Sequence, residues 1–136
     1  MANIRQNRKS NNKLTGNKGE DISCKFLVNK GFIIVDRNYR KVWGEIDIIA
    51  QKDNILHFFE VKSVTVQSFH DLGNDTRRPE DNVHGLKIRH IRRMVETYLD
   101  ENHIGLEIEF RFHVICVYLN MANRMAKLRM IENIIL

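Results

Sequence analysis

Two short charged strings interrupt neighbouring stretches of apolar and β-branched residues, and they restrict the fold of this chain more than any other feature. The strings are Gly44-Glu45-Ile46-Asp47 and Glu60-Val61-Lys62. Between them lies Lys52-Asp53-Asn54, a polar break of the kind that closes a β-hairpin. We therefore expect two paired antiparallel strands, in which Asp47 lies near Glu60.

Alternation along the strands decides which charged side chains lie together. Because residues two apart share a face, Glu45 lies on the face of Asp47, and Glu60 lies on the face of Lys62. Glu45 is about 7 Å along the strand from Asp47, so it is less suited to bind the same ion and we expect it to support the site. Glu60 and Lys62 end the largely apolar segment 55–61, where charged side chains are costly and indicate a function. The alternative is a solvated hairpin face with weak ion pairs.

Three of these residues have the chemistry of a metal-dependent nuclease. Mg²⁺ and Mn²⁺ bind carboxylate and water oxygens, and two or more acids must converge where a phosphate can join them. Asp47 and Glu60 meet that requirement. Lys62 is placed to orient the attacking water or to neutralise charge on the scissile phosphate. The pattern thus predicts hydrolysis of phosphodiester bonds with Mg²⁺ (or Mn²⁺) as the cofactor.

The charged strings belong to a longer series of motifs along the chain. The series is Gly16-Asn17-Lys18-Gly19-Glu20, Arg37-Asn38-Tyr39-Arg40, Gly44-Glu45-Ile46-Asp47-Ile48-Ile49-Ala50 and Phe59-Glu60-Val61-Lys62. From Gly16 onward, the chain resembles the YraN-like proteins, a family of small predicted endonucleases in the restriction-endonuclease-like, PD-(D/E)XK superfamily. The joint spacing of the four motifs is far more specific than any one of them.

The resemblance implies an α/β fold with a restriction-endonuclease-like core, in which helices flank a mixed β-sheet in the order α-β-β-β-α-β. It also implies that the substrate is DNA, that Asp47 and Glu60 are the metal-binding acids, and that Lys62 is the motif lysine. Glu20 is then the acid of the first helix that points into the site and assists catalysis. By itself, a carboxylate in a first helical turn indicates only stabilisation of the helix N-terminus.

Three positions differ from the family pattern. Ser63 and its neighbours follow the motif lysine where an arginine or threonine is usual, His113 stands in place of an aspartate, and Trp43 in place of a glycine. None of these changes removes a proposed metal ligand. They support an alternative function, a non-catalytic nucleic-acid-binding or adaptor module that retains the nuclease fold. A scaffold that binds only protein is a third possibility.

Positive charge is concentrated at the start of the chain. Residues 1–19 contain five Lys and Arg and no acid, and the remaining 17 Lys and Arg equal the 17 Asp and Glu. We therefore expect a basic arm over residues 1–15, disordered in isolation, followed by a single nuclease-like domain over residues 16–136. The arm would bind nucleic-acid phosphates or serve only as a solubilising tail.

Further contacts with nucleic acid are expected from basic and aromatic residues. The candidates are Arg40, Trp43, Arg77, Arg78 and Lys87. Arg77 and Arg78 lie in the mostly polar segment 63–82, which we expect to form a mobile loop, and Lys87 lies on the basic face of a helix expected over 82–100. The opposite face of that helix is apolar, with Ile88, Ile91, Val95 and Tyr98 or Leu99. Without a nucleic-acid partner, these basic residues form an ordinary solvated surface.

The remaining elements follow from hydrophobic periodicity. We expect a helix over 19–29, a strand over 32–39, a central strand over 108–119 and a last strand over 127–131. No apolar run approaches the ~18 residues of a membrane span and no secretory signal is evident, so we expect a cytoplasmic protein. Cys24 and Cys116 lack metal-site spacing and are expected to be buried free thiols.

Overall fold

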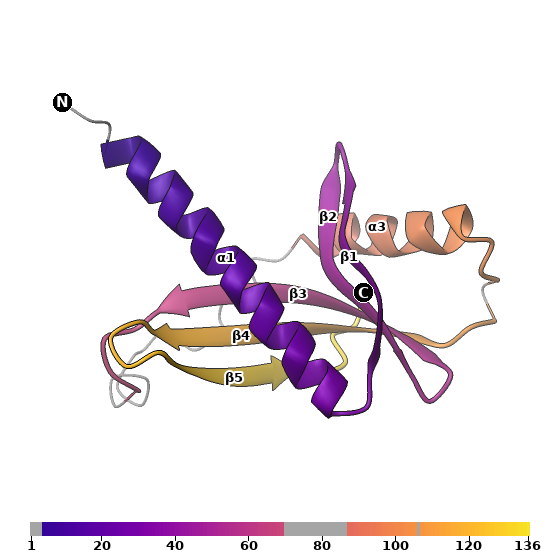
Figure 1. Cartoon of the computed structure of the whole chain (residues 1–136). Coiled ribbons are helices and arrows are strands. Elements are labelled where there is room, and N and C mark those ends of the chain that lie inside the picture. The colour runs from indigo at the N-terminus through magenta and orange to yellow at the C-terminus, as the bar shows by residue number, and fades with distance from the viewer. Residues whose placement is uncertain (1–3, 70–86, 106) are drawn as a thin grey trace.

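The computed structural model describes residues 4–69, 87–105 and 107–136 and has a mixed α/β fold, as the sequence predicted (Figure 1). Its elements in chain order are α1 (Ile4–Asn29), β1 (Ile33–Lys41), β2 (Gly44–Lys52), β3 (Ile55–Thr65), α3 (Ile88–Glu101), β4 (Phe110–Asn120) and β5 (Met125–Ile131). The five strands form one sheet in the order β1-β2-β3-β4-β5, in which β3 and β4 are parallel and the other neighbours antiparallel. This arrangement is consistent with a restriction-endonuclease-like core.

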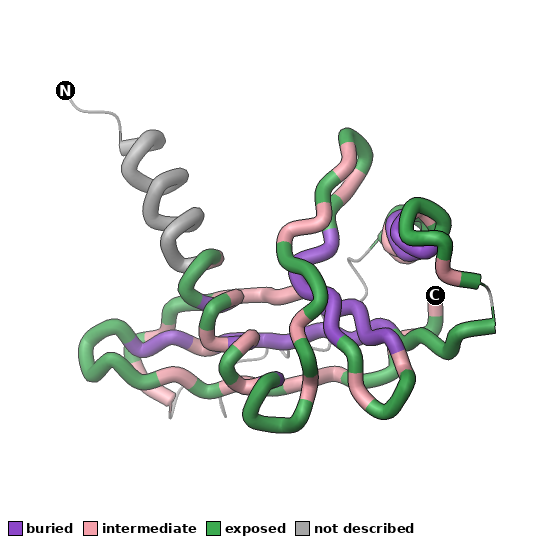
Figure 2. Tube along the Cα trace, turned by 45° about the vertical axis from the view of Figure 1, so that its right-hand side comes forward, coloured by how far each residue is buried: buried purple, intermediate pink, exposed green. Residues whose placement is uncertain are grey.

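The two helices pack on opposite faces of the sheet. Leu27 of α1 belongs to a buried cluster with Phe59 and Ile115, whereas Val95 of α3 belongs to a second cluster with Phe58. In the tube view, the buried residues run along the central strands between the two layers (Figure 2). Because a sheet covered on both faces excludes water from its middle strands, any charged group placed there is strongly affected by burial.

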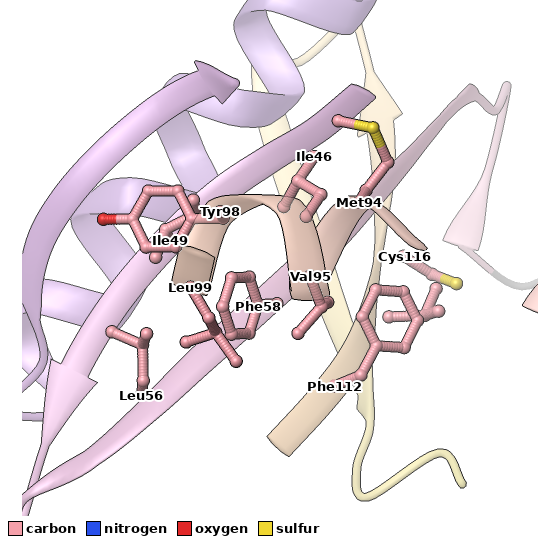
Figure 3. Close-up of a cluster of buried hydrophobic side chains, with 11 residues drawn as sticks. Ile46, Ile49, Leu56, Phe58, Met94, Val95, Tyr98, Leu99, Phe112 and Cys116 are labelled. Carbon is pink, nitrogen blue, oxygen red and sulfur yellow. The ribbon is translucent and has the colours of Figure 1, made fainter. Parts of the chain in front are cut away.

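Helix α3 buries only part of the expected apolar side. Its buried residues are Met94, Val95, Tyr98 and Leu99, of which the sequence had not singled out Met94, whereas Ile88 and Ile91 are only partly buried. Figure 3 shows Val95 and Leu99 beside Phe58, whereas Met94 lies farther along the cluster, on the side of Ile46. The helix begins at Ile88, and the part of the expected helix before Lys87 lies outside the described residues.

Several element boundaries differ from the sequence prediction. Helix α1 begins at Ile4 rather than at residue 19, because extending a helix costs far less than nucleating one. Strand β3 continues to Thr65, so the first residues of the expected loop are part of the sheet. The division of the chain at residue 15, with disorder of the isolated arm, stays a prediction. No helix in the described residues combines the length and hydrophobicity that crossing a bilayer requires.

The hairpin of β2 and β3 is confirmed, including its turn. Strand pairing ends at Lys52 and Ile55, and the two residues between them, Asp53 and Asn54, have φ of 53° and 62°. Two successive residues in the left-handed region form the tight turn that matches the twist of a hairpin, and Asp and Asn tolerate that region better than most residues. The polar break was therefore a local signal that determined the turn.

Strands β2 and β3 separate after a few pairs and form a fork. Pairing between them runs only from Lys52 to Ile48 of β2, whereas β2 continues to pair with β1 as far as Gly44. At the fork, the β1–β2 ladder passes from the Arg37–Ile48 pair to the Tyr39–Ile46 pair, and Asn38 between them has a φ of 54°. In Figure 1, the β1–β2 hairpin rises out of the line of β3, β4 and β5.

Candidate active site at the strand fork

Asp47 lies at the point where the two strands part. Its neighbours Ile46 and Ile48, which would share a face in a regular strand, belong instead to the buried clusters on opposite faces, so β2 rotates at this residue. The Asp47 side chain is turned toward β3 and accepts a 2.7 Å hydrogen bond from the backbone N–H of Val61. The carboxylate thus occupies the place that the partner strand has left.

Helix α1 approaches the fork through a glycine. A Cβ added to Gly19 would lie 1.8 Å from the Oγ of Ser63 on β3, so only glycine permits this distance between helix and strand. The Ser23 hydroxyl donates a 2.8 Å hydrogen bond to the Gly19 carbonyl one turn earlier. The close contact brings the next residue, Glu20, to the level of Asp47.

Three carboxylates converge beside the fork. One oxygen from each of Glu20, Glu45 and Asp47 lies within 4.8 Å of the others. Burial, followed by the charge of Asp47, raises the pKa of Glu20 above its ordinary value. The Glu20 Oε2 atom is buried and has no hydrogen-bond partner among the described residues, and the Arg37 Nη2 atom lies 3.6 Å from it. Arg37 makes its closer contact, 2.9 Å, with Asp21.

Glu60 and Lys62 extend the site on the other side of Asp47. On the parallel neighbour β4, they pair with Val114 and Cys116, which belong to the cluster beneath α3. Both side chains therefore point to the α3 face, whereas Glu20 reaches the fork from the α1 face. The Lys62 Nζ atom lies 3.2 Å from Glu60 Oε1. Asp47 therefore links the pair of Glu60 and Lys62 to the acids Glu20 and Glu45.

The electrostatics of Asp47 are dominated by burial and by neighbouring carboxylates. Burial, and after it the charge of Glu60, raises the pKa of Asp47 to about 7, although the hydrogen bond from Val61 opposes the shift. Glu45 and a side-chain hydrogen bond with Glu60 raise the pKa further. Near neutral pH, this carboxyl group therefore carries a proton part of the time.

The structure brings together the four residues that the sequence singled out as catalytic. Asp47 contacts Glu60, Lys62 pairs with Glu60, and Glu20 meets Asp47 from α1. Glu45 lies closer to the acids than its distance along the strand suggested. The spacing of Glu45 and Asp47 in the sequence did predict that they share a face of the strand. The rotation of β2 at the fork could not be predicted from the sequence.

Two of the positions that differ from the family pattern contact groups other than the acids. Ser63 is partly buried beneath Gly19, and its buried hydroxyl oxygen has no hydrogen-bond partner within the described residues. The Nε2 atom of His113 lies 2.8 Å from the Nδ1 atom of buried His57, and the Asn133 backbone N–H donates a 3.0 Å hydrogen bond to its Nδ1 atom. Ser63 therefore forms part of the contact between β3 and α1, whereas His113 belongs to the packed interior.

The candidate nucleic-acid contacts have different surroundings. Arg40 is exposed and pairs with Glu45 at 3.1 Å. Trp43 is partly exposed, with the Arg93 guanidinium 4.4 Å from its ring centroid. Lys87 is exposed at the start of α3. Arg77 and Arg78 lie outside the described residues. Neither cysteine forms a disulfide bond within the described residues, and Cys116 is buried whereas Cys24 is partly buried.

Comparisons with known proteins identify relatives over most of the chain. A model of Uncharacterised protein family UPF0102 matches residues 19–117, which include all the acids at the fork. A UPF0102 protein of Campylobacter jejuni strain 81-176 is 39% identical over 104 residues, 76% of this chain and 83% of that protein. One from Dictyoglomus turgidum is 36% identical over 110 residues, 81% and 86% of the two chains. One from Campylobacter lari is 64% identical over 50 residues, 37% and 45% of the two chains.

Proposed function

The chain belongs to the uncharacterised family UPF0102, whose name states no activity, and from the four acids at the strand fork we propose that it is a divalent-metal-dependent nuclease that hydrolyses phosphodiester bonds of DNA. The observation that carries this proposal is the position of Asp47. It is a buried carboxylate with a pKa raised to about 7, and it lies beside Glu20 and Glu45. It also interacts with Glu60, which in turn pairs with Lys62.

The donor set suits Mg²⁺ or Mn²⁺. Carboxylate oxygens are the ligands that these hard cations prefer, and the buried oxygen of Glu20 without a hydrogen-bond partner is a position that a cation would satisfy. We assign Asp47 and Glu60 as the principal metal-binding residues, with Glu20 and Glu45 completing the negative environment on the α1 side. A bound cation would supply polarisation of a phosphoryl oxygen.

The other groups of the site act on the phosphate and on water. Lys62 is half-exposed, so its ammonium group can exchange Glu60 for a phosphate oxygen when a substrate binds, and it then neutralises charge that develops on the scissile phosphate. Glu20 lies opposite Lys62 across Asp47 and can accept a proton from the attacking water, since burial raises its pKa and so increases its basicity. The exposed basic residues Arg40 and Lys87 would hold the backbone of the nucleic acid.

The proposal is tested by cleavage of DNA with the purified full-length protein. We expect Mg²⁺ or Mn²⁺ to support cleavage of at least one of a panel of single-stranded, duplex and branched substrates, and EDTA to abolish it. Asp47→Ala and Glu60→Ala should lose both cleavage and Mn²⁺ binding measured by calorimetry. Glu96→Gln, which changes an exposed acid of α3 that pairs with Arg92, is the control and should retain both.

The same experiments separate the alternative functions. A non-catalytic nucleic-acid-binding module would bind DNA in a salt-dependent manner, with no effect of Mn²⁺ or of Asp47→Ala. A protein-binding scaffold would show neither metal binding nor DNA affinity. If all substrates stay intact with Mg²⁺ and Mn²⁺ while the protein is folded, the nuclease proposal is wrong.

A further inference from the structure

The tip of the β1–β2 hairpin carries two apolar side chains that the fold does not bury. Val42 lies in the turn between the two strands and is fully exposed, and 36% of the surface of Trp43 beside it is accessible. Figure 2 shows the hairpin rising clear of the rest of the chain, with exposed residues at its end. Turns are usually formed by polar residues, so two adjacent apolar side chains are unusual here and are available for a contact with another molecule.

The tip is held rigidly by α3. The Tyr39 hydroxyl donates a 2.7 Å hydrogen bond to Glu101, and Lys41 forms an ion pair with the same carboxylate. Nearer the tip, Trp43 packs against Arg93, and a Cβ added to Gly44 would lie 3.0 Å from Met94. These contacts support the residues on both sides of Val42, which reduces the entropic cost of ordering the tip against a partner.

The surroundings of the tip favour a nucleic acid as that partner. Arg40 is exposed on β1, and Arg89 and Arg93 are exposed on the part of α3 that lies beside the hairpin. Arg93 covers the Trp43 ring on one side, and its guanidinium group remains able to bind a phosphate. An aromatic ring and a small apolar side chain between arginines match the elements with which proteins unstack bases and hold the backbone beside them.

The tip is also close to the proposed catalytic acids. Trp43 directly precedes β2 and is four residues from Asp47, which is at most about 13 Å of extended chain. In one strand of nucleic acid, this length corresponds to about four nucleotides at roughly 3.4 Å each. A base that contacts Trp43 is therefore linked through a short piece of backbone to a phosphate at the fork.

We propose that Val42 and Trp43 form a wedge that enters a duplex at a junction with single-stranded nucleic acid, where Trp43 stacks on the last base pair or on the displaced base. This inference rests on the proposed nuclease function and gives its substrate class: duplexes with a single-stranded branch or end, cleaved about four nucleotides from the junction. A regular duplex is a poorer substrate because its base steps must first be unstacked.

Base unstacking can be measured without cleavage. The full-length protein in EDTA is added to a forked DNA with 2-aminopurine at the junction, and to a linear duplex of the same sequence. We expect the fluorescence of 2-aminopurine to rise with the forked DNA alone. Trp43→Ala and Val42→Ser should each remove the rise, and Trp43→Ala should weaken binding to the fork about tenfold, as expected for the loss of one aromatic–base stack.

A matched control and a second readout complete the test. Val28→Ser makes the same substitution at a partly exposed valine of α1 and should leave fluorescence and binding unchanged. Equal binding of forked and linear DNA by wild type and by Val42→Ser overturns the wedge, even if the protein cleaves DNA with Mg²⁺. Unstacking that depends on Trp43 without any cleavage supports the wedge and contradicts the nuclease proposal instead. If Val42→Ser only changes the molecular mass in sedimentation, the tip contacts protein and the inference is wrong.

Discussion

Replacing Asp47 by Asn should stabilise the metal-free protein, because the fold holds this carboxylate at a cost. An unfolded Asp ionises at its ordinary pKa of 3.8, whereas burial and Glu60 raise the pKa of Asp47 to about 7 in the folded chain. Because the pKa is higher in the folded state, the contribution of Asp47 to the free energy of unfolding is fully present below pH 3.8. This contribution is lost as the pH rises through about 7.

The magnitude follows from the size of the shift. Each pKa unit corresponds to about 1.4 kcal/mol, so a shift of about three units costs the folded protein up to about 4 kcal/mol at a pH of about 8. Asn removes the charge and keeps an oxygen that can accept the hydrogen bond from Val61. The variant should therefore be more stable than wild type by up to about 4 kcal/mol at a pH of about 8 and nearly equal to it below a pH of about 4.

Urea denaturation in EDTA at a series of pH values measures this difference. Asp100→Asn, at an exposed position of α3, is the matched control and should change the free energy of unfolding by less than about 0.5 kcal/mol at any pH. Mn²⁺ should then stabilise wild type and leave Asp47→Asn unchanged, since a ligand stabilises only the state that binds it. A variant that is no more stable than wild type at alkaline pH would refute the proposed cost of the buried carboxylate.

Three further predictions concern other contacts of the site and the core. Gly19→Ala should destabilise the protein by about 1–3 kcal/mol and reduce Mn²⁺ affinity in calorimetry, because its Cβ would meet the Ser63 hydroxyl and displace Glu20. A second change, Ser63→Gly, should restore both the stability and the affinity, and no restoration would mean that the contact does not position the acid. Lys62→Ala should reduce the DNA cleavage rate at least about 100-fold in a single-turnover assay and retain Mn²⁺ binding, and equal loss of both would contradict its role at the phosphate. Burial, and after it the charge of His57, lowers the pKa of His113 from 6.5 to about 4. The free energy of unfolding should therefore be highest above pH 6.5 and fall by roughly 3 kcal/mol as the pH decreases to about 4, and urea denaturation of His113→Gln should show a smaller decrease over that range.

The amino-acid sequence by itself determined the features that depend on neighbours in the chain. The turn at Asp53 and Asn54, the alternation that places Glu60 and Lys62 on one face, and the apolar side of α3 are local patterns, and the structure confirms each of them. The parallel pairing of β3 with β4 also agrees with the expected order of elements, because a strand that follows a crossover helix returns parallel to its predecessor.

Tertiary structure decided how the acids meet. The rotation of β2 at Asp47, the contact of Gly19 with Ser63 and the convergence of Glu45 with Glu20 depend on groups that are distant in sequence, so no local pattern indicates them. The pKa of Asp47 has the same origin, since it is set by burial between two helices and by a carboxylate on another strand. The sequence therefore named the charged residues, whereas the fork decided that they form one site, because charge–charge and desolvation energies depend on distances in space rather than on positions along the chain.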